Sequence, residues 1–374
     1  MSNDTYPGLY LHIPFCKSKC PYCNFYSETE LSGVTAWQNA LVKEMLLYKN
    51  HFPAFDSLYL GGGTPTVLED AVLRNLFDHL YRHFQFTPDT EITIEANPND
   101  ITRAKLQLLK ACGVNRISLG VQSFDAQVIT FLKRRHSVGE AEQALDLIQE
   151  SGFATVSVDL MYGIPGQARE GWLKTLERAL TFHPAHLSCY QLTVAEGTEL
   201  GERNKRGVIT LPDEAEETAL FLDTAHCLEE HGYLHYEISN FASGEATRSR
   251  HNQKYWQHTP YLGLGPSAHS FQQGKRWWNH RSIEEYCSAL SVGKAPVSGK
   301  EHLTREQLDL ESLYLGLRTS AGVDLTRLND RSGCEAVLPG LLKEDYVALI
   351  GQRMVPTRKG FLVADRLAGV FMGR

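Results

Sequence analysis

Short apolar runs of strand length alternate with longer stretches of helical periodicity through the first half of the chain. The runs that predict strands are LYLHIP (9–14), SLYLGG (57–62), EITIEANP (91–98), RISLGVQSF (116–124), TVSVDLMYG (155–163) and HLSCYQLT (186–193). The stretches that predict amphipathic helices are 35–50, 66–84, 101–112, 139–151 and 168–182. This alternation indicates βαβ units and a parallel sheet. Six units are too many for a small flavodoxin-like sheet and too few for an eight-unit barrel. We therefore predict an α/β fold with an open (β/α)6 partial TIM barrel.

The alternation ends near residue 235. EISNFA (237–242) predicts a last strand, 243–281 a polar, aromatic-rich loop region, and the Gly- and Pro-rich 291–300 a linker. The remainder predicts helices at 301–319, near 324–330 and at 334–343, then a β-hairpin through 354–365 and a final helix. We therefore expect three segments: a barrel over 1–235, an extension with a linker over 236–295, and a small C-terminal winged-helix-like domain over 296–374.

Composition and charge narrow the class of protein. The 374 residues are 42% hydrophobic, which supports a sizeable core, and the net charge of −7 supplies no basic field for nucleic acid. Acidic residues also dominate the C-terminal helices, which argues against a DNA-binding winged helix. The apolar runs are too short to span a bilayer, although peripheral membrane contact stays possible. The first ten residues resemble no signal peptide, so we expect a cytoplasmic protein with reduced thiols.

Polar or Gly-rich features follow every predicted strand of the barrel. They are a Cys cluster after the first strand, GGGTP (61–65), EANP (95–98), Gln122-Ser123, Asp159, and Gln191 with Thr193. The carboxyl ends of parallel strands meet at one edge of the sheet, where α/β folds collect their chemistry. We therefore expect these features to form one site.

Three of the eight cysteines carry the clearest chemical signal. Cys16, Cys20 and Cys23 have C-x3-C-x2-C spacing on one loop, which suits three corners of a cubane [4Fe–4S] cluster and leaves one iron open. A methionine moiety can chelate that open iron through its amino and carboxylate groups. A zinc site would need His12 as fourth ligand and has no second cysteine pair, and inert cysteines are improbable among Lys17, Ser18 and Lys19. The five scattered cysteines are interpreted as small buried hydrophobes.

Together, the motifs of this chain resemble those of a known family. The cysteine motif with Tyr22, GGGTP, EANP, GVQSF (120–124) and VDLMYGIPGQ (158–167) resemble the radical S-adenosylmethionine (SAM) superfamily, in its anaerobic coproporphyrinogen oxidase-like branch. The resemblance covers most of the chain and implies a [4Fe–4S] cluster and SAM. By matching motif positions it implies a SAM pocket made by Tyr10, Gly62, Gly63, Thr64, Glu95, Gln122, Arg134 and Asp159. The plainer alternatives are a tight βα turn for the glycines, a helix N-cap or surface carboxylate for Glu95, and a solvated helix end for Arg134.

Two departures from the pattern of the decarboxylating enzyme indicate which member of this branch the chain resembles. The decarboxylating enzyme carries a fourth cysteine where this chain has Phe25, and it has a longer N-terminal segment than the nine residues before Tyr10. Both departures resemble HemW-type heme chaperones instead, as does RHNQKYW (250–256), which matches an HNxxYW element. That resemblance implies heme as cargo, and the imidazole of His251 is the candidate axial ligand, ahead of His258 and His269. The plainer alternative is that His251 and Trp256 pack the open end of the barrel.

Two hypotheses follow. The first is a heme-binding chaperone that keeps the cluster and SAM site and delivers heme to acceptor proteins such as respiratory enzymes. The second is a SAM-radical tetrapyrrole enzyme that decarboxylates coproporphyrinogen III or degrades heme, and Phe25 weakens its decarboxylase form. The sequence leaves open whether SAM is turned over, which protein accepts heme, and whether the chain is a monomer or a dimer.

Overall fold

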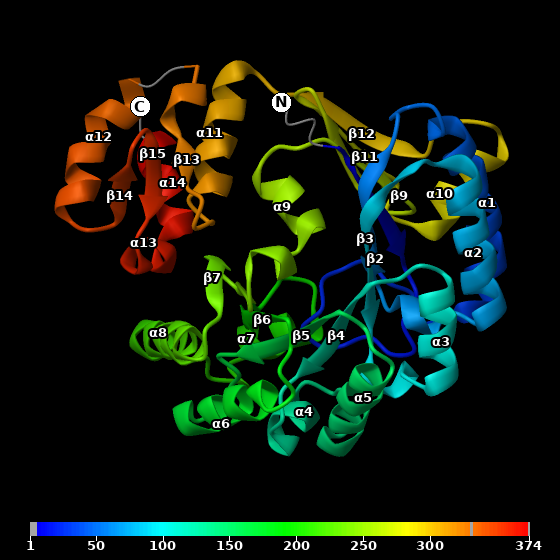
Figure 1. Cartoon of the computed structure of the whole chain (residues 1–374), viewed down its shortest axis with the longest axis horizontal. Coiled ribbons are helices and arrows are strands. Elements are labelled where there is room, and N and C mark those ends of the chain that lie inside the picture. The colour runs from blue at the N-terminus through cyan, green and yellow to red at the C-terminus, as the bar shows by residue number, and fades with distance from the viewer. Residues whose placement is uncertain (1–5, 330–331, 373–374) are drawn as a thin grey trace.

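The computed structural model of the chain describes residues 6–329 and 332–372. Within them, twelve strands form one sheet in the order β12-β11-β10-β9-β1-β2-β3-β4-β5-β6-β8-β7. Six consecutive strands are parallel and curve into the open barrel that the alternation predicts. Figure 1 shows the helices on the outside of this curve. The six strands are β1 (Gly8–Ile13), β2 (Phe55–Gly62), β3 (Phe86–Ala96), β4 (Arg116–Gln122), β5 (Thr155–Tyr162) and β6 (His186–Gln191).

Five of the eight barrel helices begin at a residue whose side chain caps the helix, and α1, α2 and α6 do not. Ser137 and Glu140 form a reciprocal capping box at the start of α5, and Asp213 and Glu216 form another at the start of α8. Their apolar faces pack on the strands and form one large core. The bounds are α1 (Val34–Tyr48), α2 (Asp70–His83), α3 (Arg103–Ala111), α4 (Ala126–Phe131), α5 (Val138–Glu150), α6 (Arg169–Leu180), α7 (Glu199–Lys205) and α8 (Glu214–Glu230).

The segment after residue 233 extends the sheet at both edges. One hairpin pairs antiparallel with β6, and at the opposite edge β9 pairs parallel with β1 and leads into three antiparallel strands. The predictions of a loop region over 243–281 and a linker over 291–300 were therefore wrong. The elements are β7 (Leu234–Glu237), β8 (Asn240–Ala242), α9 (Arg250–Trp256), β9 (Tyr261–Leu264), β10 (His269–Gln272), β11 (Lys275–Asn279), α10 (Ile283–Ser291) and β12 (Val297–His302).

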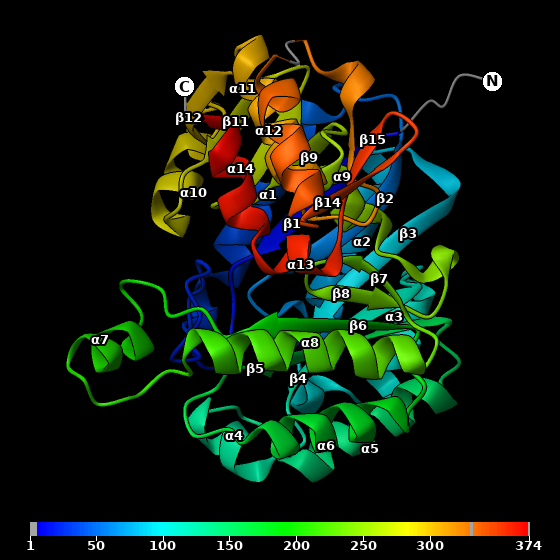
Figure 2. The same cartoon turned by 90° about the vertical axis from the view of Figure 1, so that its left-hand side faces the viewer.

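The C-terminal unit has its own small core, which includes Leu317, Val323 and Met354. A three-stranded sheet lies among its helices, as Figure 2 shows, and this arrangement fits a winged-helix-like unit. The predicted hairpin was displaced: it lies at 347–356, and 358–372 is helical. The elements are α11 (Arg305–Gly316), β13 (Val323–Asp324), α12 (Ser332–Lys343), β14 (Val347–Ile350), β15 (Arg353–Pro356), α13 (Arg358–Leu362) and α14 (Ala364–Met372). Because β12 belongs to the main sheet, the division proposed at 295 moves to about Thr304, the N-cap of α11.

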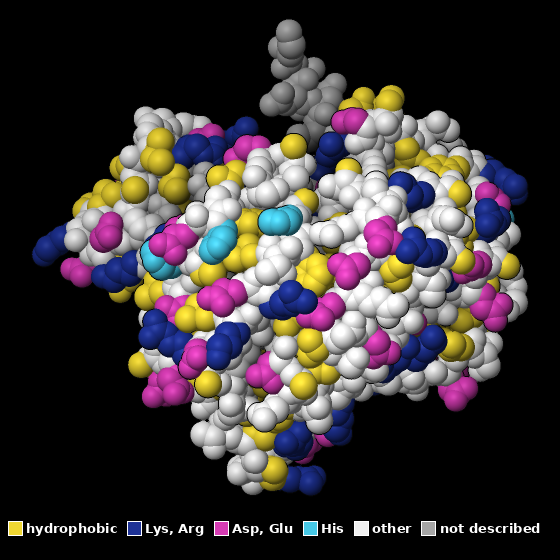
Figure 3. All heavy atoms as spheres, turned by 60° about the horizontal axis from the view of Figure 1, so that its bottom comes forward, with side chains coloured by type: hydrophobic (Ala, Val, Ile, Leu, Met, Phe, Trp, Pro, Cys, Tyr) yellow, Lys and Arg dark blue, Asp and Glu magenta, His cyan; other side chains and the backbone are white. Residues whose placement is uncertain are grey.

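The surface carries both charge signs. Figure 3 shows Lys and Arg side chains interspersed with Asp and Glu over the face that it presents, without a large patch of one sign. Many of these charges form exposed ion pairs, such as Arg103 with Glu150 and Lys133 with Glu199. Across the described ranges 6–329 and 332–372, no helix combines the length and apolar character needed to cross a bilayer.

Candidate functional site

A cavity of about 430 Å³ lies inside the barrel and extends from Arg116 and His186 at the amino ends of their strands to the cysteine loop at the carboxyl ends. Alternate residues of β3, β4, β5 and β6 line it, because side chains two apart on a strand face the same side. Of the residues expected in the SAM and cluster site, the cavity brings together Cys23, Gly62, Gly63, Thr64, Glu95, Gln122, Arg134 and Asp159.

The three motif cysteines lie on the loop after β1, and their thiols are partly buried and unbridged. The Cys23 amide donates to the Cys20 carbonyl at 3.2 Å, and the Cys16 sulfur lies 3.5 Å from the Thr64 hydroxyl. Burial raises the pKa of both Cys16 and Cys23, and charge on the neighbouring thiols adds to the rise. A positively charged iron centre among them would remove that cost, because coordinated thiols are deprotonated. The donor set therefore fits a cluster.

His12 is not free to act as the fourth ligand of a zinc ion. Both ring nitrogens of His12 are engaged: Nδ1 lies 3.0 Å from the Tyr10 hydroxyl and Nε2 lies 2.9 Å from the Tyr26 carbonyl. In the part of the chain that the structure describes, no three His, Cys, Asp or Glu side chains converge as around a single metal ion. A cubane differs, because each thiolate binds its own iron.

Arg134 joins the cluster loop to the barrel. Its guanidinium donates to the Gly120 carbonyl at 2.8 Å, to the Cys20 sulfur at 3.2 Å and to the Tyr22 hydroxyl at 3.3 Å. Its Nε is buried without a partner, so one donor stays available at the cavity wall. The interpretation of Arg134 as a solvated helix end was therefore wrong.

The glycine-rich end of β2 lies against Glu95. The Glu95 carboxylate accepts from the Tyr59 hydroxyl at 2.8 Å and from the Gly62 amide at 3.2 Å. Burial raises the pKa of Glu95 to about 7, and the charge on Asp159 adds to this rise. A cation in the cavity would favour the ionised carboxylate. The Glu95 side chain thus forms part of the cavity wall, and the interpretation of Glu95 as a helix cap was wrong.

Gly62 has a steric reason to be glycine. Its φ is +98°, and a Cβ there would overlap the His12 ring. We expect Gly62→Ala to lower the free energy of unfolding by about 3 kcal/mol or more, from strain plus overpacking. Gly166→Ala is the matched control, because its φ is +79° but its surroundings are open, and about 1 kcal/mol is expected there. Urea unfolding measures both, and equal losses would remove the steric explanation.

Asp159 lines the same cavity as Glu95. It accepts from the Ser118 hydroxyl at 2.9 and 3.1 Å, and burial raises its pKa to about 6. Tyr59 and Ser118 were missed by sequence reasoning, as were the other inward-facing residues Thr93, Ser157, Ser188 and Tyr190. Their signal was a polar residue at every second position within an otherwise apolar strand. The strand ends alone do not reveal these positions.

Tyr10 lies outside the main cavity. It lines an adjoining cavity of about 240 Å³ with Tyr59, Gly62 and Glu95, so it approaches the site from the β1 side. Burial holds the pKa of its phenol far above the usual range, which keeps the hydroxyl protonated as a hydrogen-bond partner of His12. Gln122 lines the main cavity with a positive φ of 68°, at the end of β4.

The candidate heme ligand His251 is fully buried and has no free nitrogen. Its Nδ1 lies 3.0 Å from the Ser57 hydroxyl and its Nε2 lies 2.8 Å from the Tyr255 hydroxyl. Burial lowers its pKa to about 3. These contacts argue against His251 as an axial ligand and favour the plainer alternative, in which His251 and Trp256 pack the open end of the barrel.

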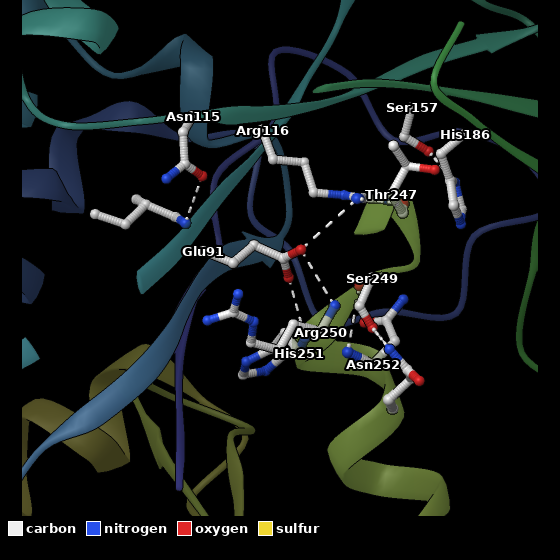
Figure 4. A network of polar contacts seen from close by, with 12 residues as sticks. Glu91, Asn115, Arg116, Ser157, His186, Thr247, Ser249, Arg250, His251 and Asn252 are labelled. Carbon is white, nitrogen blue, oxygen red and sulfur yellow. Dashed lines mark hydrogen bonds and ion pairs between the residues drawn. The ribbon is translucent and has the colours of Figure 1, made fainter. Parts of the chain in front are cut away.

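Helix α9, which carries that element, is anchored at the amino ends of the barrel strands. The Glu91 carboxylate accepts from the Arg250 amide at 3.1 Å and from the His251 amide at 3.0 Å. Figure 4 shows this carboxylate at the start of the helix. A carboxylate is favourable there because it meets unpaired amides and the positive end of the helix dipole. Arg116 pairs with Glu91 at 3.6 Å and donates to the Thr247 carbonyl.

A curved parallel sheet with a three-cysteine loop and an acidic, Gly-walled cavity defines a radical SAM protein. Accordingly, the Radical SAM superfamily model matches residues 10–179. This domain implies SAM and an iron–sulfur cluster.

Comparison with related proteins shows to which family within this superfamily the chain belongs. The chain is 36% identical to the heme chaperone HemW of Mycobacterium tuberculosis, over 98% of this chain and 95% of that protein. It is 32% identical to HemW of Bacillus subtilis, over 97% and 98%. The chain belongs to the HemW family. It also resembles the solved structure of the coproporphyrinogen III oxidase HemN from Escherichia coli, a radical SAM enzyme, with 25% identity, a TM-score of 0.84, and 98% and 90% of the two chains covered.

Proposed function

We propose that this chain is a heme chaperone: it binds heme and passes it to acceptor proteins such as respiratory enzymes. Similarity to HemW proteins along nearly the whole chain carries the proposal. In this proposal the protein acts in the cytoplasm as a monomer or a dimer. Nucleic acid is not among its proposed partners. Any membrane contact would be peripheral.

The resident cofactors of the proposal are a [4Fe–4S] cluster and SAM. Cys16, Cys20 and Cys23 would hold three irons and leave the fourth for SAM. Bound SAM supplies a route to radical chemistry through reductive cleavage. The acidic wall of Glu95 and Asp159 suits the cationic ligand, and the free Nε of Arg134 suits a carboxylate. The backbone of Gly62 and Gly63 allows close approach.

Phe25 distinguishes the proposal from tetrapyrrole decarboxylation. It occupies the position of the enzyme's fourth cysteine, is 64% exposed and lines the cavity mouth. An exposed aromatic ring offers a flat apolar surface but no thiol. The enzymatic alternative retains support from the overall likeness to HemN and from the intact cavity.

One experiment separates these functions. The cluster is reconstituted anaerobically, and the protein is incubated with SAM, a reductant and coproporphyrinogen III, with the Escherichia coli enzyme HemN as positive control. In parallel, hemin is titrated and the Soret band followed. We expect saturable hemin uptake and no protoporphyrinogen IX. Product formation at a rate comparable to the control would overturn the chaperone proposal in favour of the enzyme.

A further inference from the structure

A second hollow lies on the strands that extend the sheet beyond β1, and it reaches β1 itself at Tyr10 and His12. Two cavities of about 410 and 380 Å³ share Tyr255, Tyr261 and His269, so they lie side by side, and together they are called the groove here. Each is within the size range of small-ligand pockets, and together they offer room for a large planar ligand. Of the predicted SAM residues only Tyr10 lines the groove, and none of the three motif cysteines does.

The groove has an aromatic floor because neighbouring strands present the same face. His269 and Phe271 on β10 lie opposite Trp278 and Arg276 on β11, in antiparallel register. The imidazole of His269 stacks on the indole of Trp278, with ring centroids 5.8 Å apart and planes at 25°. The Tyr261 and Phe271 rings are also stacked, at 6.2 Å and 28°. Flat rings in this arrangement suit a flat, apolar ligand.

Two glycines leave the space that the residues of this floor occupy. A Cβ at Gly299 on β12 would overlap the Trp278 indole, and a Cβ at Gly263 on β9 would overlap the His269 backbone. Trp278 therefore lies over a strand position that only glycine leaves empty. The close contact between Trp278 and Gly299 therefore fixes the position of the indole in the floor of the groove.

His269 is the histidine of the groove with a free ring. Among the described residues its imidazole has no hydrogen-bond partner, it is exposed, and burial with the nearby Arg276 lowers its pKa. By contrast, both nitrogens of His258 are engaged, by Glu311 and by Ser312. A neutral, exposed imidazole is a good ligand for heme iron.

The two ends of the groove differ in charge. Arg276 is already neutralised by Glu301 and Glu311, at 3.1 and 2.6 Å. At the other end Arg281 is exposed, and among the described residues it makes a hydrogen bond to the Asn24 carbonyl and no ion pair. A ligand with carboxylates along one edge would direct them to Arg281.

Phe25 connects the groove to the cluster side. It lines the groove cavity that holds His269 and Arg281, the small cavity beside Tyr10, and the main barrel cavity. The exposed ring thus lies where the three spaces meet. A planar ligand on the groove floor would reach the side of the molecule that carries the cysteine loop.

We propose that this aromatic groove is the heme site, with His269 as the iron ligand, Trp278 and Tyr261 against the macrocycle, and Arg281 facing the propionates. The assignment rests on the proposed chaperone function and replaces His251 as the ligand.

The test compares hemin with metal-free protoporphyrin IX on the full chain. His269→Ala is expected to weaken hemin binding by about tenfold or more, the loss of one coordinate bond's net contribution, and to shift the Soret band. Protoporphyrin IX has no iron to ligate, so its affinity should change by less than about twofold. Trp278→Leu should weaken both ligands. His302→Ala, which removes an exposed imidazole from the neighbouring strand β12, is the matched control and should bind both as the wild type does.

The outcomes are separable. If the wild type binds hemin and His269→Ala binds it equally with an unchanged Soret band, the groove assignment is overturned and the chaperone proposal stands. If His251→Gln loses hemin while its circular dichroism is unchanged, the assignment is also overturned. If the wild type binds neither hemin nor protoporphyrin IX, the chaperone proposal itself fails, and the groove assignment with it.

Discussion

The Cys20→Ser variant, reconstituted anaerobically, is expected to retain less than about a tenth of the wild-type iron and sulfide, because a cubane with one open iron has no protein ligand to spare. The wild type should contain about four irons per chain. Cys20 is also the thiol that Arg134 contacts at 3.2 Å, so its loss frees the guanidinium as well. Iron and sulfide analysis, with the EPR spectrum of the reduced protein, measures the effect.

Cys287→Ser provides the matched control for this loss. Cys287 is a partly buried free thiol on α10, it packs against the main core, and it is not part of the motif. Its variant should bind the same iron as the wild type. If Cys20→Ser retained a full cluster, or if SAM left the EPR spectrum of the wild type unchanged, the assignment of the three cysteines would be wrong.

Glu95→Gln is expected to weaken SAM binding by about tenfold to a hundredfold, because a charged hydrogen-bond acceptor facing a cationic ligand is lost. The same change should stabilise the protein without ligand at high pH. Burial raises the pKa of Glu95 from 4.5 to about 7. The stability contributed by the neutral carboxyl is complete below about pH 4.5 and is lost as pH rises through 7.

The amide that replaces the carboxyl does not ionise, so the variant should gain roughly 1–3 kcal/mol over the wild type at pH 8 and nothing at pH 4.5. Urea unfolding at both pH values measures this gain, and calorimetric titration of the cluster-loaded protein measures SAM affinity. Glu69→Gln, at an exposed carboxylate that precedes α2, is the control and should show neither effect. A wild-type pH profile that matched the Glu95→Gln profile would mean that Glu95 is not the buried acid of the site.

Much of the fold was readable because its signals are local. Strands β1–β6 are short runs rich in apolar residues, and the helices between them carry one apolar stripe. The carboxyl ends of parallel strands meet by geometry, so Glu95, Gln122 and Asp159 could be placed together before any coordinates. Tyr59 and Ser118 were missed because they lie within strands, where polar residues at every second position face the cavity.

The extension was misread for a related reason. Residues 297–302 are mostly polar or charged, since β12 is an edge strand exposed to solvent, and nothing in its composition distinguishes it from a linker. Pairing with β11 supplies the hydrogen bonds that make it a strand. Edge strands of this kind are defined by their neighbours in space.

The sequence alone determined the class of protein and predicted its cluster ligands, since three cysteines on one short loop lie close together in any fold of the chain. It could not determine which histidine is free to bind iron. His251 and His269 belong to the same stretch of chain, yet one is buried with both nitrogens bonded and the other is exposed on an aromatic floor. That difference comes from partners such as Ser57 and Trp278, and only the folded chain brings them into contact.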